Sequence, residues 1–196
     1  MFDVSHMGEC MISGPAARDF LDMMITNNLS DLREERAMYT VMCYENGTCV
    51  DDLIVYRLRA EKEEGYRFFV VMNASNTEKD LKHFKDYAEK FLSRDGECAQ
   101  GNGLIIEDLS DRYLQIALQG PESVDFIKKH FPFYSLEDSF SCCEKGSMII
   151  GRTGYTGEKG YEFYIKGVEE ASDFWNQLCE SGVKWGCLMF LIWENV

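Results

Sequence analysis

Two adjacent carboxylates, Asp51 and Asp52, stand inside an apolar run at residues 50–59 that is typical of a β-strand. Aspartate is depleted in strands, so its presence here needs a physical reason. Neighbouring strand residues point to opposite faces of a sheet, and these two side chains therefore cannot share one proton as a catalytic dyad. We expect one of them to enter a pocket and the other to cap a turn or face water. The alternative is that both are surface residues beside a turn.

A glycine-rich segment at residues 151–162 is the second candidate, with the sequence Gly-Arg-Thr-Gly-Tyr-Thr-Gly-Glu-Lys-Gly-Tyr-Glu. Glycines allow the backbone to approach a ligand closely. Tyr155 and Tyr161 offer flat stacking faces with a polar tip. An ordinary hairpin around residues 157–160 is the alternative. A phosphate-binding loop fits poorly, because Lys159 lacks the Gly-Lys-Ser/Thr arrangement.

The segment at residues 2–9 contains Asp3, Ser5 and His6, which are the residue types of a hydrolytic triad. They lie too close in sequence to converge as orienting acid, nucleophile and base. No nucleophile-elbow motif surrounds Ser5. This segment therefore does not predict a hydrolase.

Composition bounds the class of protein. The chain has 196 residues, of which 45% are apolar and 28% charged, as in a packed globular protein. Its formal charge of −14 makes nucleic acid an unlikely partner, because an acidic surface repels phosphates. No apolar run approaches the roughly 20 residues of a membrane helix. The 8 cysteines include no Cys-x-x-Cys pair, which favours reduced, mostly buried thiols over disulfides or a zinc site.

The periodicity of apolar residues predicts the elements that must position these side chains. Helical spacing is found at residues 15–28, 75–91 and 168–182. Runs of β-branched and aromatic residues predict strands at residues 9–13, 38–44, 50–59, 66–73, 113–118, 147–152 and 160–166. Turns are expected at residues 45–48, where Asn-Gly is a strong hairpin signal, and at the charged residues 61–65.

An internal similarity organises these elements into two halves. Residues 12–21 (Ile-Ser-Gly-Pro-Ala-Ala-Arg-Asp-Phe-Leu) are similar to residues 118–127 (Leu-Gln-Gly-Pro-Glu-Ser-Val-Asp-Phe-Ile). Both predict a strand, a Gly-Pro turn and a helix, and in each half a hairpin and another helix follow. Residues 94–102 have no periodicity and form the expected boundary. The pattern predicts two related α+β modules, over residues 1–95 and 103–184, each a sheet with helices on one face.

Five segments, in order along the chain, resemble the T-protein family of the glycine cleavage system, which are tetrahydrofolate-dependent aminomethyltransferases. The segments are residues 2–9 (Phe-Asp-Val-Ser-His-Met-Gly-Glu), 51–56 (Asp-Asp-Leu-Ile-Val-Tyr), 70–76 (Val-Val-Met-Asn-Ala-Ser-Asn), 117–121 (Ala-Leu-Gln-Gly-Pro) and 152–158 (Arg-Thr-Gly-Tyr-Thr-Gly-Glu). The resemblance covers residues 2–183. It implies the two modules of the folate-binding aminomethyltransferase fold without the family's C-terminal barrel domain.

The resemblance also implies a reaction. A T-protein takes the aminomethyl group carried by the lipoylated H-protein and passes its carbon to tetrahydrofolate, which yields methylenetetrahydrofolate and ammonia. The cofactor implied is tetrahydrofolate, and the implied partner is the H-protein, with neither a membrane nor a nucleic acid involved. The implied compartment is the cytoplasm for a bacterial protein and the mitochondrial matrix for a eukaryotic one.

Individual roles follow from matching positions in the family. The resemblance assigns catalysis to Asp52 and recognition of the pterin to Glu162. A carboxylate can accept a fork of two hydrogens from the pterin edge. A fixed negative charge stabilises a cationic carbon, and it can also take a proton. We expect Asp52 and Glu162 to meet across one cavity, with no metal ion required. The positions that the family places near the folate are Tyr39, Ile54, Tyr56, Asn73 and Tyr155.

The chain also departs from the family. Residues 185–196 form an apolar tail where the family continues through a Gly-Leu-Gly-Ala-Arg-Asp stretch, whose arginine contributes to the pocket. The sequence therefore predicts a fragment with weak folate binding and little or no turnover. The alternatives are a related folate-dependent demethylase, the folate-binding module of an amine dehydrogenase, and a folate-binding protein without catalytic activity.

Overall fold

The computed structural model describes residues 1–60, 65–94, 103–183 and 190–191. The chain forms two compact units. The first unit is Met7–Ser110, and the second unit combines Met1–His6 with Asp111–Val196. These bounds differ from those expected from the sequence, because residues 1–6 join the second unit and residues 103–110 the first. Most of the charged turn at 61–65, of the boundary at 94–102 and of the apolar tail lies outside the described residues.

The first unit is an antiparallel five-stranded sheet with the order β3-β4-β5-β2-β6. Its elements in chain order are β2 (Gly8–Gly14), α1 (Ala17–Met24), the 3-10 turn η1 (Leu29–Asp31), β3 (Arg36–Cys43), β4 (Cys49–Leu58), β5 (Tyr66–Met72), the 3-10 turn η2 (Ala74–Asn76), α2 (Thr77–Arg94) and β6 (Ile105–Asp108).

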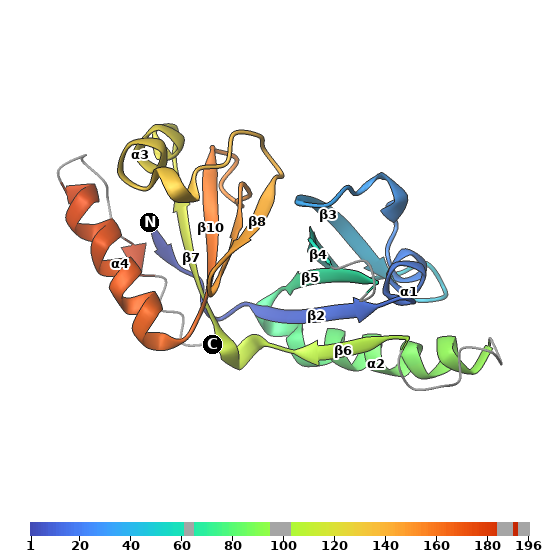
Figure 1. Ribbon diagram of the computed structural model, residues 1–196. Helices are drawn as coiled ribbons and strands as arrows, with labels where there is room; N and C mark the ends of the chain where they lie inside the picture. The colour runs from blue at the N-terminus through green and yellow to red at the C-terminus, as the bar shows by residue number, and fades with distance from the viewer. Residues whose placement is uncertain (61–64, 95–102, 184–189, 192–196) are drawn as a thin grey trace. The chain divides into compact units, whose positions relative to one another are not determined.

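Helices α1 and α2 pack on one face of this sheet (Figure 1). Phe20 of α1 and Phe84 of α2 are fully buried in the same core as Val55 of β4. Since side chains alternate along a strand, the neighbours of Val55, which are Ile54 and Tyr56, lie on the opposite face. The face of the sheet opposite the helices thus carries Ile54 and Tyr56, two of the residues expected to lie near a ligand.

The second unit is a six-stranded sheet with the order β11-β1-β7-β10-β9-β8. Its elements in chain order are β1 (Phe2–Asp3), the 3-10 turn η3 (Ser110–Arg112), β7 (Tyr113–Gln119), α3 (Ser123–His130), the 3-10 turn η4 (Pro132–Tyr134), β8 (Cys142–Lys145), β9 (Met148–Gly151), β10 (Gly160–Lys166), α4 (Val168–Val183) and β11 (Phe190–Leu191). Ile127 of α3 and Phe174 of α4 pack with Phe163 of β10 in one core (Figure 1).

The two units repeat one topology, which confirms the predicted pair of related α+β modules. The order β3-β4-β5-β2 in the first unit matches β8-β9-β10-β7 in the second. Gly14 and Gly120 turn the chain from strand to helix with φ angles of 113° and 134°, which favour glycine. The units differ at the next strand, because β6 pairs with β2 whereas the N-terminal β1 pairs with β7.

The helix expected at residues 15–28 is shorter than predicted. The chain is extended at Ile25, and η1 follows instead of a further helical turn. Asn28 accepts a hydrogen bond from the Ser30 amide, and Asp22 accepts one from the Leu29 amide. These side chains offer the backbone an alternative to helical hydrogen bonds and so end the helix.

The other predicted elements are found within a few residues of their expected ends. The hairpin expected at residues 45–48 is confirmed: the Tyr44 amide donates to the Thr48 carbonyl, and Gly47 has a φ of 82°. Strands β1, β6, β8 and β11 were not predicted; segments of two to four residues give only a weak alternation signal.

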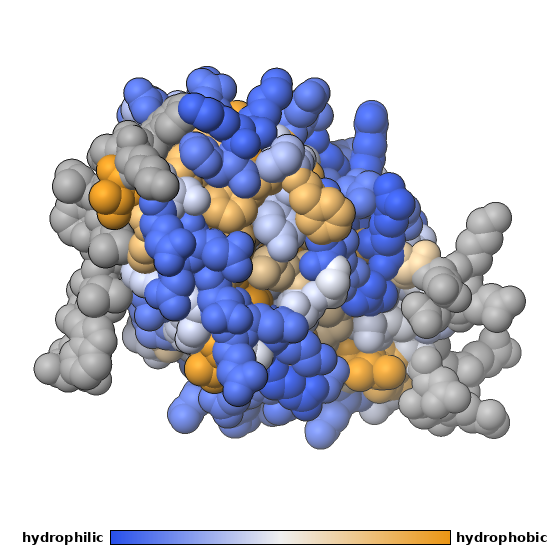
Figure 2. Space-filling view, turned by 60° about the vertical axis from the view of Figure 1, so that its left-hand side comes forward, coloured by the Kyte–Doolittle hydropathy of each residue, from blue (hydrophilic) through white to orange (hydrophobic). Residues whose placement is uncertain are grey.

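The structure can be compared with the expectations from composition for the surface and for the thiols. Hydrophilic residues make up much of the face shown in Figure 2, with apolar residues between them. Within the described residues, no helix combines the length and apolar character needed to cross a bilayer. The six described cysteines are free thiols, and three of these, Cys10, Cys142 and Cys143, are buried.

Candidate functional site

The two adjacent aspartates point to opposite faces of β4, as strand alternation predicts. Asp51 pairs with Met42 of β3, whose side chain is in the core on the helix side, and Asp51 is only 6% exposed. Asp52 is exposed and lies on the helix-free face. Of the two, only Asp52 is therefore open to a ligand on that face.

Asn73, which follows β5, holds both aspartates with one side chain. Its Nδ2 donates to Asp51 Oδ1 at 3.0 Å and to Asp52 Oδ1 at 3.1 Å. Its backbone amide also donates to Asp51 Oδ2 at 3.3 Å. The position of the Asp52 carboxylate is thus coupled, through a single amide group, to the buried Asp51.

Tyr39 of β3 completes the surroundings of Asp52. Its hydroxyl hydrogen-bonds to the Asp52 carboxylate, and this bond raises the pKa of Tyr39. The ring is 54% exposed, so one face is available for stacking. The structure therefore brings together three residues predicted from the sequence: Tyr39, Asp52 and Asn73.

Ile54 and Tyr56 share the helix-free face with Asp52. Ile54 pairs with Tyr39 across β3 and β4, whereas Tyr56 is fully buried with its ring 6.1 Å from Phe69. Ile54 therefore lies on the same face as Asp52, and Tyr56 is part of the buried packing of that face.

Glu9 of β2 was missed by the sequence analysis. By register it lies on the same helix-free face, since Glu9 pairs with Val71 and Val71 pairs with Ile54. It is fully buried, and neither carboxyl oxygen has a hydrogen-bond partner among the described residues. Burial, with a smaller contribution from Asp108, raises the pKa of Glu9 to about 9. A glutamate within a strand was the only signal that could have indicated it.

In the second unit, Glu162 of β10 is buried and held by neutral donors. Gln115 Nε2 donates to Glu162 Oε1 at 3.0 Å, and Thr153 Oγ1 donates to Glu162 Oε2 at 2.5 Å. Gln115 is 2% exposed, and its Oε1 has no hydrogen-bond partner among the described residues. The cluster thus combines a carboxylate with a buried carbonyl oxygen that still needs a donor.

Tyr155 lies beside this cluster and remains accessible. Its ring is 58% exposed and packs edge-to-face on Phe2 with centroids 5.9 Å apart. Partial burial, together with the charge of Glu162, raises the pKa of Tyr155. Within this unit an exposed aromatic ring is therefore close enough to Glu162 for the charge of the carboxylate to act on its hydroxyl.

Two glycines of the segment at residues 151–162 serve a contact within the protein. A Cβ at Gly154 or Gly160 would collide with the side chain of Gln119. Gln119 Nε2 donates to the carbonyl oxygens of Thr153 and Tyr161, both at 3.3 Å. These two glycines thus let Gln119 anchor the loop, which is a different use from the close ligand approach expected from the sequence.

Arg152 of the same segment also has an internal role. It is buried, and it donates to the carbonyl oxygens of Leu136 and Gly160. Its guanidinium lies 4.8 Å from the centre of the Tyr161 ring. The guanidinium of Arg152 therefore serves to hold the loop in place.

The N-terminal polar residues form a local turn. Asp3 Oδ1 accepts hydrogen bonds from the Ser5 hydroxyl at 2.6 Å and from the Ser5 amide at 3.0 Å. His6 is exposed. Ser5 therefore uses its hydroxyl to close the turn after β1.

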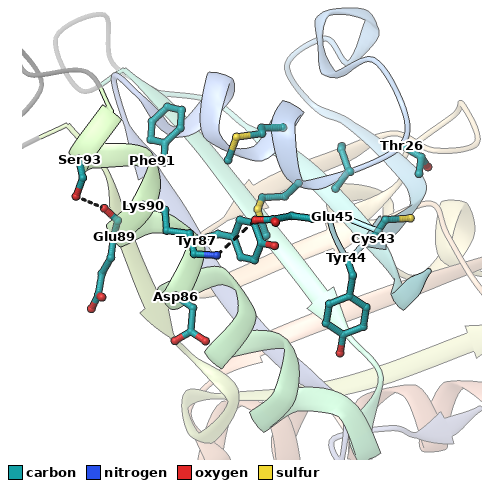
Figure 3. A pocket seen from close by; sticks show the side chains of 13 residues that line it. Thr26, Cys43, Tyr44, Glu45, Asp86, Tyr87, Glu89, Lys90, Phe91 and Ser93 are labelled. Atoms are coloured by element: carbon teal, nitrogen blue, oxygen red, sulfur yellow. Dashed lines mark hydrogen bonds and ion pairs between the residues drawn. The ribbon is translucent and has the colours of Figure 1, made fainter. Parts of the chain in front are cut away.

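A cavity of about 1020 Å³ lies on the helix side of the first unit. Figure 3 shows residues of α2 facing the β3–β4 turn across it, with Lys90 and Glu45 joined by an ion pair of 3.4 Å. A smaller cavity of about 380 Å³ lies in the second unit between Ile116 and Trp175. None of the site residues predicted from the sequence lines either cavity. The predicted site residues therefore form two separate clusters, one around Asp52 in the first unit and one around Glu162 in the second.

No group of three or more His, Cys, Asp or Glu side chains within the described ranges has an arrangement that could hold a metal ion. Asp52 and Glu162 belong to different units, and the expectation that they meet across one cavity stays a prediction.

The comparisons with known proteins agree on the family. Residues 1–190 match the model of the GCVT N-terminal domain. The chain is 39% identical over 192 residues to an aminomethyltransferase of Oceanobacillus iheyensis, with 93% of this chain and 47% of the relative covered. It is 40% identical over 188 residues to the aminomethyltransferase of Chlorobium phaeobacteroides, again with 93% and 47% covered.

A solved structure is similar as well. The crystal structure of glycine cleavage system aminomethyltransferase T from Bartonella henselae matches with a TM-score of 0.70 and 26% identity, over 90% of this chain and 44% of that one. The chain spans about half the length of the curated relatives it matches. With two related α+β units and a family model that matches nearly its whole length, the chain belongs to the GCVT N-terminal domain family.

Proposed function

We propose that this chain supplies the folate-binding part of a tetrahydrofolate-dependent aminomethyltransferase of the glycine cleavage system. The observation that carries the proposal is the buried cluster of Glu162, Gln115 and Thr153 in the second unit. A buried carboxylate beside a carbonyl oxygen without a donor is costly unless a ligand donates hydrogen bonds to it. The aminomethyltransferase relatives support the reaction class.

These groups fit the pteridine of tetrahydrofolate. The amino and ring N–H groups along one pteridine edge are donors, and both Glu162 and Gln115 Oε1 are acceptors. The exposed rings of Tyr155 and Tyr39 suit the flat faces of such a ligand. Tetrahydrofolate would supply the nucleophilic nitrogen that receives the one-carbon unit.

Asp52 has the role of the catalytic carboxylate in this proposal. Asn73 and Tyr39 fix its orientation by hydrogen bonds, so little reorganisation is needed when charge develops on the substrate. A carboxylate held in this way stabilises positive charge on the transferred carbon and can accept a proton from the attacking nitrogen. The donor of the aminomethyl group would be the lipoyl arm of the H-protein, and the proposal requires Asp52 and Glu162 to face the same ligand.

Calorimetric titration with tetrahydrofolate tests the proposal. Glu162→Ala should lower the affinity tenfold to a hundredfold, since a hydrogen bond to a charged group contributes about 1.5–3 kcal/mol. Glu158→Ala, an exposed residue of the same loop, is the matched control. Unchanged binding by Glu162→Ala, or a wild-type chain that does not bind, would contradict the proposal.

A measurement of product formation distinguishes the proposed role of Asp52 from that of Glu162. The wild-type chain is expected to form little methylenetetrahydrofolate with aminomethyl-lipoyl H-protein as donor, and Asp52→Ala should abolish what it forms while it changes tetrahydrofolate affinity less than Glu162→Ala does. Asp19→Ala, an exposed aspartate of the same unit, serves as the control. Turnover with methylated amines but not with the H-protein would point instead to a demethylase. Binding without any turnover would point to a folate-binding protein.

A further inference from the structure

Two cysteines face each other across the hairpin of β3 and β4. Cys43, at the end of β3, pairs with Cys49, at the start of β4, in the register of these antiparallel strands. Both are free thiols, of which Cys49 is exposed and Cys43 half-buried. No other two cysteines among the described residues are register partners. The hairpin therefore brings together two thiols that a short turn separates in the sequence.

The side chains of this pair share the helix-free face of the sheet. Cys43 lies between Met42, which is in the core on the helix side, and Tyr44, whose ring lies 5.1 Å from an imidazole ring on α2. Because neighbouring strand residues alternate, the Cys43 side chain points away from the helices. Cys49 precedes Val50, which is buried in the same core, so Cys49 points to the same side as Cys43.

The turn between the strands fixes the separation of the two cysteines. The Tyr44 amide donates to the Thr48 carbonyl and the Gly47 amide to the Tyr44 carbonyl, both at 2.8 Å. Asn46 Oδ1 accepts from the Thr48 amide at 3.0 Å and from the Thr48 hydroxyl at 2.7 Å. Opposite Cα atoms of antiparallel strands are about 4.5–5.5 Å apart, and disulfides span about 4.4–6.8 Å between Cα atoms. The strand pairing is therefore compatible with a disulfide at this position.

We propose that Cys43 and Cys49 are a redox-active pair, which a small disulfide of the glutathione type oxidises to one intramolecular disulfide. The thiolate of the exposed Cys49 attacks one sulfur of the oxidant, whose S–S bond breaks and releases one thiol. The Cys43 thiolate then attacks the Cys49 sulfur and releases the second thiol. The two protons lost by the cysteines end on the two released thiols. This reaction needs neither folate nor turnover, so its outcome is independent of the function proposed above.

Mass spectrometry of the full chain, equilibrated with oxidised and reduced glutathione and then alkylated, tests the proposal. No lysine or arginine separates Cys43 from Cys49, so both lie in the tryptic peptide of residues 37–57. With excess oxidised glutathione, this peptide should lose two hydrogens and carry no alkyl group. Cleavage after Glu45, between the two cysteines, should then leave two fragments that separate only on reduction. A peptide that is alkylated at both cysteines would overturn the proposal.

The same digest contains a matched control. Cys142 and Cys143 are neighbours in β8, and both lie in the tryptic peptide of residues 130–145. Because neighbouring strand residues point to opposite faces, this peptide should keep both alkyl groups. Equal oxidation of the two peptides would show that strand register does not select the pair. A disulfide from Cys43 or Cys49 to any other cysteine would contradict the proposal as well.

A variant and a denaturant distinguish a pair built by the fold from two thiols that are only close in sequence. In Cys43→Ser, Cys49 has no partner thiol and should keep glutathione as a mixed disulfide, which the wild type resolves. In urea, the equilibrium constant for disulfide formation should fall at least about tenfold, because the folded strands no longer hold the thiols together. The unfolding constant of the oxidised chain should be smaller than that of the reduced chain by the same factor. Glutathione retained on Cys49 of the wild type, or equal constants in buffer and in urea, would overturn the proposal.

Discussion

In the first unit, the candidate carboxylate Asp52 is exposed on β4 and is held by an amide and a phenol at the end of the sheet. In the second unit, Glu162 is buried on β10 between Gln115 and Thr153. The strand orders of the two units match, yet β4 corresponds to β9 and β10 corresponds to β5. The two units therefore share the topology of their scaffold, but their candidate carboxylates lie on strands that do not correspond to each other.

This difference separates two requirements of a ligand site. A buried carboxylate recognises a fixed pattern of donors, because a wrong ligand leaves it without hydrogen bonds. An exposed but oriented carboxylate can serve a reacting group that arrives and leaves. The roles proposed for Glu162 in recognition and for Asp52 in chemistry fit their respective environments. The following experiments test this contrast, beginning with the largest expected effect.

The cores of the two units can be destabilised separately. Phe163 is fully buried and packs 4.9 Å from the ring of Phe174, so Phe163→Ala should cost the second unit about 3–5 kcal/mol. None of the 3 tryptophans lies in Met7–Ser110, and Trp175 packs against the core of the second unit, so tryptophan fluorescence reports the unfolding of this unit in urea. Phe133→Ala, at a residue 66% exposed, is the control. An equal shift of the fluorescence and circular dichroism transitions would mean that both units unfold as one.

The buried carboxylate depends on its neutral donors. Gln115→Leu removes a hydrogen bond to Glu162 and should destabilise the second unit by about 1–3 kcal/mol in urea unfolding. Thr156→Val removes an exposed hydroxyl that donates to Gln119 and should change stability by less than about 0.5 kcal/mol. Similar effects of the two variants would show that the burial of Glu162 has no energetic importance.

The first unit should lose stability as the pH rises. Since the pKa of Glu9 is raised to about 9 in the folded state, the folded unit holds a proton that the unfolded chain releases above about pH 4.5. Its free energy of unfolding should fall by at most about 1.4 kcal/mol per pH unit up to pH 9. Glu9→Gln should remove this contribution to the pH dependence of the free energy of unfolding, which is measured by urea titration at several pH values. If the Glu9→Gln variant showed the same pH dependence of stability as the wild type, the raised pKa of Glu9 would not be its cause.

The glycine-rich loop should respond to loss of its anchor. Gly160→Ala displaces Gln119 and weakens its hydrogen bonds to two loop carbonyls, which should cost about 1 kcal/mol. In a double-mutant cycle with Gln119→Ala, the combined cost should be smaller than the sum of the separate costs. Additive costs would show that Gln119 does not explain the glycine at this position.

The sequence predicted the strand faces well, because alternation is a local property. The opposite orientations of Asp51 and Asp52, and the strand at Gly160–Lys166 that carries Glu162, both follow from residues close together in the chain. The pairing of Glu162 with Gln115 depends on the register of β7 against β10, and no local pattern states that register.

The burial of Asp80 could not be predicted from the sequence. An acidic residue in the first turn of a helix is ordinarily favourable at the surface, because it complements the helix dipole. Nothing in residues 75–91 distinguishes Asp80 from such a residue. Its complete burial arises only when α2 packs on the sheet.

The pairing of β1 with β7 has a consequence for how the protein is made. The first unit is continuous, so it can fold while later residues are still on the ribosome, whereas the second unit must wait for Asp111 onward to join a strand synthesised at the outset. The finished first unit brings its own ends together, since the Leu109 amide donates to the Glu9 carbonyl at 2.9 Å. Most of the entropy of closing that long loop is therefore already lost before β7 emerges. Folding of the first unit thus prepares the N-terminal strand to complete its neighbour's sheet.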